Sequence, residues 1–111
     1  MKKRPKKKIV VSLKIVAFAD SFAENKDIAR YLRESQILPA LQEGKEIIFD
    51  YEGVDSTTQS FTHALISDAI RKFGSNVLDR IFFKNCNKDV KSIIRIVVEY
   101  MQGNMNSPIS A

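Results

Sequence analysis

Residues 46–66 read EIIFDYEGVDSTTQSFTHALI, and this stretch contains the strand, the turn and the helix start that decide the fold. The consecutive large apolar residues at 47–49 predict a central strand that is covered on both faces of its sheet. A polar stretch with one glycine follows and predicts a loop over 52–60. Apolar residues then recur at helical spacing, so residues 61–73 predict a helix with Ser60 as its N-cap.

On the amino-terminal side, Val, Ile and Phe dominate residues 9–18. This composition predicts one strand, or two strand pieces joined near 12–14. A polar connection over 19–26 follows. Apolar residues at helical spacing then predict a helix over 27–42, in which Pro39 either kinks the helix or starts a second one.

On the carboxyl-terminal side, the sequence predicts a strand over 78–84 and a last helix that ends near Met101. Asn85 or Asn87 is expected to cap this helix. The β-branched residues of 93–98 favour a strand by propensity, but the apolar positions keep helical spacing across the segment, and we therefore predict a helix.

Strands and helices thus alternate, which predicts an α/β domain with a mostly parallel or mixed four-stranded sheet and helices packed on it. The domain is expected to span 9–102, between a flexible basic arm (1–8) and a flexible polar tail (103–111). Residues 9–18 are expected at one edge of the sheet. An edge strand must be shielded or paired, so the sequence also predicts a homodimer as one way of covering it.

The composition limits the classes of function. A chain of 111 residues is the usual size of one domain. Cys86 is the single cysteine, so no internal disulfide can form, and this indicates a cytoplasmic protein. No stretch is apolar enough to cross a bilayer, so we expect no membrane association.

The net charge of +5 is unevenly distributed along the sequence. The amino-terminal arm carries six positive charges, and the remaining residues sum to −1. A basic arm can bind nucleic acid through counterion release, and this is the alternative function that the sequence leaves open. The candidate contacts are Lys2, Lys3, Arg4, Lys6, Lys7 and Lys8.

We expect that the protein is not an enzyme and that it binds neither a metal ion nor a cofactor. His63 is the single histidine, and no further His or Cys lies at the spacing of metal ligands. Ser60, His63 and Asp50 could form a catalytic triad on paper, but no nucleophile-elbow sequence surrounds Ser60. The four glycines are scattered and form no phosphate-binding loop.

Two segments resemble the bacterial STAS-like family of unknown function, which is related to anti-sigma-factor antagonists. The first runs from Asp50 through Gly53 and Val54 to the helix start at Phe61. The second reads FFKNCNKDVKSII and contains Asn85 and Asn87. The resemblance covers about residues 9–101, with the first third matched by layout alone.

The resemblance implies a regulatory module that binds a protein partner through the loop and helix start after the central strand. The first partner to test is a kinase-like ATPase of the GHKL (histidine-kinase-like) class. The residues that correspond to such an interface are Asp55, Ser56, Thr57, Thr58, Gln59, Ser60 and His63.

Related antagonists are phosphorylated on a serine at this helix start. Here Gln59 occupies the position of that serine, and glutamine cannot be phosphorylated. Ser60 and Thr58 are the remaining candidate phosphorylation sites. In place of the acidic pair that the STAS-like family usually carries after Phe61, this chain has Thr62 and His63.

Overall fold

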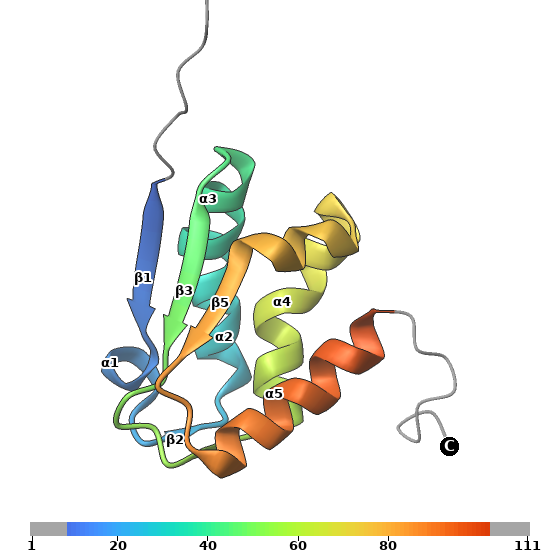
Figure 1. Ribbon diagram of the computed structural model, residues 1–111. Coiled ribbons are helices and arrows are strands. Elements are labelled where there is room, and N and C mark those ends of the chain that lie inside the picture. Colours follow the sequence, from blue (N-terminus) through green and yellow to red (C-terminus); the bar gives the residue numbers. More distant parts are fainter. Residues whose placement is uncertain (1–8, 103–111) are drawn as a thin grey trace, which may run out of the picture.

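The computed structural model describes residues 9–102, so the predictions for the arm (1–8) and the tail (103–111) lie outside the described residues. Strands and helices alternate along the chain (Figure 1), which confirms the α/β class. The elements are β1 (Val10–Lys14), α1 (Ile15–Ala19), β2 (Phe22–Ala23), α2 (Lys26–Leu32), the π-helical segment η1 (Arg33–Ile37), α3 (Leu38–Gln42), β3 (Glu46–Asp50), β4 (Ser56–Thr57), α4 (Gln59–Phe73), the 3-10 helix η2 (Ser75–Arg80), β5 (Ile81–Lys84) and α5 (Lys88–Met101).

The main sheet has three parallel strands in the order β1–β3–β5, so β3 is central, as the sequence predicts. β2 and β4 form a separate two-stranded parallel ladder. The prediction of one four-stranded sheet is therefore wrong. The helix α1 ends at Asp20, which has a positive φ of 60°. After this residue the chain runs away from the main sheet into β2, which pairs with β4 in the loop after β3.

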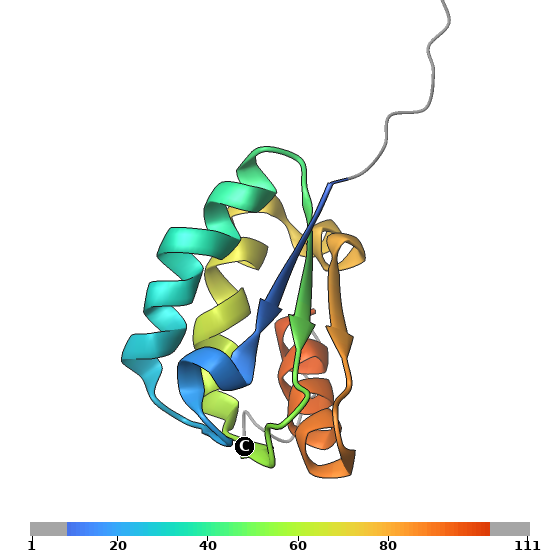
Figure 2. The ribbon, with the colours of Figure 1, turned by 90° about the vertical axis from the view of Figure 1, so that its left-hand side faces the viewer.

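The described helices cover one face of the main sheet and leave the other face open (Figures 1 and 2). Ile47 and Phe49 point toward the helices and are fully buried, whereas Ile48 is only partly buried. Val10 and Phe82 remain 45% and 43% exposed. The prediction that β3 is covered on both faces is wrong, because an apolar run also fits a strand whose alternate residues line a half-open face.

The first predicted strand is shorter than expected, because residues 15–19 form the helix α1. Ile15 and Ala19 are one helical turn apart, and both are buried. Val16 packs close to Gly53 of the loop after β3, 3.4 Å from the position that a Cβ would occupy there. Burial of these residues in a short helix outweighs their propensity for strand, which depends strongly on context.

Residues 26–42 form a helical segment that changes its hydrogen bonding in the middle, across η1. Pro39 is near the start of α3 and cannot donate to a carbonyl one turn earlier. Just before it, the Leu38 N–H donates to the carbonyl of Arg33, five residues back, as a π-turn requires. The two alternatives for Pro39, a kink or the start of a second helix, therefore each hold in part. The helical segment continues through Pro39, but its hydrogen bonding changes just before it.

The last helix is confirmed as α5, despite its many β-branched residues. Its buried positions Val90, Ile94 and Val97 keep helical spacing. The preceding strand is shorter than predicted, because residues 75–80 form the 3-10 helix η2. Arg80 at the end of η2 donates to the carbonyl oxygens of Leu41 (2.6 Å) and Lys45 (3.2 Å), which holds this segment beside β3.

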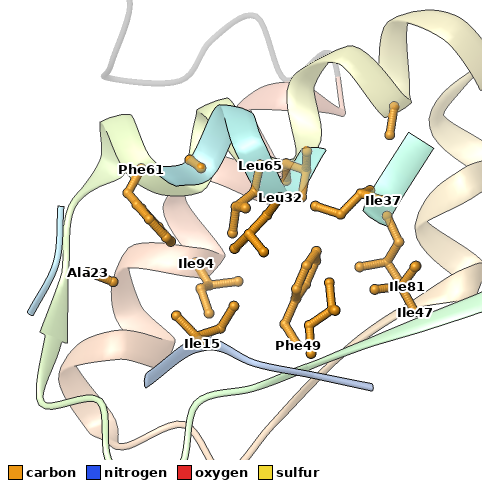
Figure 3. Packing of buried hydrophobic residues seen from close by; sticks show 14 of the residues in the cluster. Ile15, Ala23, Leu32, Ile37, Ile47, Phe49, Phe61, Leu65, Ile81 and Ile94 are labelled. Atoms are coloured by element: carbon orange, nitrogen blue, oxygen red, sulfur yellow. The ribbon is translucent and has the colours of Figure 1, made fainter. Parts of the chain in front are cut away.

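The core lies between the main sheet and the helices (Figure 3). Phe49 projects from the central strand toward Leu32 and Leu65 of the covering helices. Phe61 is fully buried and anchors the first turn of α4. This packing brings the end of β3 and the start of α4 to the same edge of the domain.

Candidate docking site

Asp50 ends β3 and organises the turn that follows. Its Oδ1 accepts hydrogen bonds from the Glu52 N–H and from the Asn85 side-chain amide, both at 3.0 Å. The Asn85 bond is the main reason why the pKa of Asp50 is lowered, and the Glu52 bond and the nearby Lys14 and Lys84 lower it further. The carboxylate is therefore held ionised as an acceptor that joins the β3 turn to the end of β5.

The loop after β3 is fixed by backbone and buried contacts. Gly53 has a φ of 87°, a region that suits glycine, and the Val54 N–H donates to the Tyr51 carbonyl at 2.9 Å. Val54 itself is buried. Further along, the Asp55 N–H donates to the Ser21 carbonyl at 2.7 Å, beside the β2–β4 ladder.

Asn87 connects this loop to α5. Its side-chain amide donates to the carbonyl oxygens of Asp55 (2.9 Å) and Val54 (3.4 Å). Its Oδ1 accepts from the Val90 N–H at 2.8 Å and so caps α5. The two asparagines of the second motif thus have distinct roles: Asn85 contacts Asp50, whereas Asn87 contacts the loop and caps the helix.

Thr58, and not Ser60, is the N-cap of α4. The Thr58 Oγ1 accepts a hydrogen bond from the Phe61 N–H at 3.0 Å. Ser60 lies inside the first turn with an exposed side chain, next to the exposed Gln59. The prediction of Ser60 as the cap is wrong because the helix begins two residues earlier than the apolar pattern indicates.

The predicted interface residues fall into two groups. Thr57 is buried, and its hydroxyl donates to the Ala23 carbonyl at 2.7 Å. Thr58 is occupied by capping, and Ser56 is half-buried in β4. The surface therefore presents a smaller group, which comprises the exposed Asp55, Gln59 and Ser60 together with the half-buried His63.

A hollow of about 310 Å³ lies beside the start of α4. Three of the predicted residues line it, Gln59, Ser60 and His63. The rest of the lining was not predicted from the sequence and comes from two other helices and from α4 itself, namely Lys26, Ala64, Val97 and Tyr100.

The lining of this hollow carries positive charge. Lys26 is the lining residue with a full positive charge. The first N–H groups of a helix also have no partner one turn earlier, so the start of α4 carries partial positive charge. We term the hollow together with Asp55 the docking site. The structure does not form the triad considered from the sequence as a hydrogen-bonded chain, since Asp50 accepts from Glu52 and Asn85.

Residues 9–102 contain neither a candidate metal-binding cluster nor a candidate membrane-spanning helix. No cluster of three or more His, Cys, Asp or Glu side chains could hold a metal ion there. Within the same residues, no helix has the length and apolar character needed to cross a bilayer.

Comparison with protein families gives one match, over residues 29–91, to a family described as a STAS-like domain of unknown function. The matched segment contains both the β3–α4 loop and the paired asparagines. Comparisons with curated proteins and with solved structures found no significant match. Because the family match spans more than half of the chain and the parallel sheet with its helices fits it, the chain belongs to the family of STAS-like domains of unknown function.

Proposed function

We propose that the protein is a non-enzymatic regulatory module that docks a partner protein through the docking site at the start of α4. The observation that carries this proposal is the contrast within the loop. Hydrogen bonds hold Thr57 and Thr58 in place, while Gln59 and Ser60 remain exposed around a basic hollow. A preordered surface loses less conformational entropy on binding than a mobile loop does.

The partner that we propose is a histidine-kinase-like ATPase of the GHKL class, in line with the family resemblance. Such a partner needs ATP, and the proposed interaction therefore takes place in the cytoplasm. The positive charge of Lys26 and of the helix start predicts that the partner contributes Asp or Glu side chains to the contact.

Ser60 is the better phosphorylation candidate of the two that the sequence offers. Its side chain is exposed in the first turn of α4, whereas the Thr58 hydroxyl is engaged by the Phe61 N–H. A phosphate on Ser60 would meet the positive helix start and Lys26 and would replace the partner's acidic group. Mass spectrometry of the protein from its native cell tests this, and modification of Thr58 alone would contradict it.

The docking proposal is tested by affinity purification of the tagged full chain from its native cell, followed by calorimetry with the purified partner. The variant Gln59→Glu/Ser60→Glu places two negative charges at the docking site, and we expect the partner's Kd to rise at least tenfold, or about 1.4 kcal/mol. The matched control is Ser75→Glu/Asn76→Asp, which makes a similar change at exposed positions of η2. Equal binding of both variants would place the interface elsewhere.

Self-association through β1 is a further proposal about partners. β1 is an edge strand of the main sheet. Its first residue, Val10, is 45% exposed, and Ile9 just before it is 59% exposed. Pairing of two β1 strands would satisfy the free edge. Light scattering after size-exclusion chromatography should give a dimer mass that falls to the monomer mass in Ser12→Pro. The Ile9 carbonyl accepts from the Glu46 N–H and so faces β3, and the N–H of Ser12, three residues later, therefore points to the free edge.

A further inference from the structure

A groove of about 490 Å³, larger than the hollow at the docking site, lies between β5 and α5. Its apolar lining comes from the strand side and from the helix side, and comprises Leu78, Ile81, Phe83, Ile94 and Val98. Asn85, Cys86, Lys91 and Arg95 complete it. None of the residues of the docking site contributes to this groove.

The groove is positively charged. Lys91 and Arg95 are four residues apart on α5 and therefore lie on the same side of the helix. No acidic residue belongs to the lining, and neither cation forms a salt bridge within residues 9–102. Two like charges at this spacing repel each other, so a bound carboxylate would relieve the repulsion.

The backbone of β5 adds hydrogen-bonding groups next to the groove. β5 pairs with β3, and no other described strand pairs with it. The Lys84 carbonyl accepts from the Tyr51 N–H at 2.9 Å and therefore points toward β3. Because the backbone groups of successive strand residues point to opposite sides, the N–H and C=O of Phe83 point away from β3, toward the free edge.

The side chains of β5 define what an added segment would meet. Ile81 and Phe83 line the groove, while Phe82 is exposed on the open face of the sheet. A segment that pairs with β5 in extended form would place every second side chain over the groove. Among the side chains on that face of the segment, apolar ones would contact the lining, and carboxylates would reach Lys91 and Arg95.

We propose that this groove binds an extended segment of a partner protein, in which apolar and acidic residues are interleaved, by addition of a strand to β5. The charge of the groove selects the acidic residues, and the free edge of β5 selects the extended conformation. This second interface is independent of the docking site, so a partner can in principle contact both. β5 has four residues, and the paired part of the segment is of similar length.

The test begins with selection of binders to the full chain from a random peptide library. We expect the enriched peptides to interleave Asp or Glu with apolar residues, and to bind Lys91→Glu/Arg95→Glu at least tenfold more weakly than the original chain. The control Arg30→Glu/Lys72→Glu reverses two exposed cations on α2 and α4 and should not change the affinity. Enriched peptides without acidic residues, or equal binding to the groove variant, would overturn the proposal.

A second measurement tests the binding geometry. Titration of the isotope-labelled chain with a selected peptide should shift amide resonances of 81–84 and 91–98, and alternate N-methylation of the peptide should abolish binding. Shifts confined to 59–63, or full affinity after N-methylation in both registers, would refute strand addition. If laurate binds the groove and the peptides do not, the occupant is an amphiphilic carboxylate and the proposal fails.

The two interfaces can be separated experimentally. Gln59→Glu/Ser60→Glu should leave peptide binding at the groove unchanged, because neither residue lines it. Loss of peptide binding in that variant would also contradict the groove as the binding site. If no partner binds at the docking site, the peptide-binding test of the groove still stands on its own.

Discussion

The polar side chains around the loop at the end of β3 and the hydroxyl of Tyr51 in the core beneath it differ in their hydrogen bonding. Asp50 and Thr58 at the two ends of the loop, and Asn87 at the start of α5, each use their side chains in hydrogen bonds that hold it. In the core, the hydroxyl of Tyr51, one residue after Asp50, is buried and has no hydrogen-bond partner among the described residues. The comparison indicates that side-chain hydrogen bonds help to fix the loop geometry, whereas the hydroxyl of Tyr51 adds no such bond to the core.

The largest expected effect comes from removing the connection between the loop and α5. Asn87→Ala deletes the cap of α5 and the bonds to two loop carbonyls, so we expect a loss of about 2–3 kcal/mol in the free energy of unfolding. Urea denaturation measures this loss in the free energy of unfolding. Asn76→Ala, at an exposed position of η2, is the control and should change stability by less than about 0.5 kcal/mol. Equal midpoints for the two variants would contradict the role of Asn87.

Removal of the α4 cap should have an intermediate effect. Thr58→Ala deletes the hydroxyl oxygen that accepts from the Phe61 N–H, and we expect a loss of about 1 kcal/mol. Ser60→Ala, two residues later, should be close to neutral because its exposed hydroxyl caps nothing. Thermal unfolding of both variants distinguishes them, and a larger loss for Ser60→Ala would mean that the helix begins later than at Gln59.

Tyr51→Phe should change stability in the opposite direction and raise the free energy of unfolding. Burial raises the pKa of the Tyr51 phenol, and its unpaired hydroxyl lowers stability in the folded state. Deleting the hydroxyl should therefore stabilise the protein by about 1 kcal/mol, seen as a higher melting temperature. Tyr31→Phe is the matched control, because Tyr31 is 57% exposed and should be indifferent to the change. Destabilisation by Tyr51→Phe would show that the hydroxyl has a partner in solution.

The smallest effect concerns Asp50, whose side chain is accessible to solvent. Its folded-state pKa is lowered, chiefly by Asn85, so its contribution to stability is present above the unfolded pKa of about 3.9 and is lost as the pH falls through the folded value. Urea midpoints measured from pH 7 to pH 3 should fall further for the original chain than for Asp50→Asn. The same two proteins are then compared with Asn85→Gly added to both, since glycine tolerates the φ of 58° at this position. The difference between their pH dependences should shrink. An unchanged difference would contradict Asn85 as the main cause of the lowered pKa of Asp50.

The sequence predicts the elements whose apolar pattern is regular and long. The central position of β3, the helix after it and the helical nature of α5 all follow from such patterns, even where β-branched residues oppose them. The helix α1 could not be predicted in this way. Its residues favour a strand, and the burial of Ile15 and the contact of Val16 with Gly53 exist only in the folded chain.

The docking site could be predicted only in part. Gln59, Ser60 and His63 follow from the family resemblance, but Lys26 and Tyr100 join them through packing of helices that are distant in sequence. The burial of Thr57 and the capping by Thr58 were also missed, because a run of hydroxyl residues carries no signal of which one faces inward. For such loops the sequence predicts where an exposed polar surface lies but not which side chains form it.

The β2–β4 ladder indicates which residues the domain needs in order to fold on its own. The amides of Asp55, Ser56 and Thr58 donate to carbonyls of residues 21 and 23, so they should exchange slowly with solvent although they lie near the surface. A fragment trimmed to the matched family segment, 29–91, would lack both β2 and the edge strand β1. Such a fragment would leave the loop without its backbone acceptors, and an autonomous version of the domain therefore has to start upstream, at or before β1.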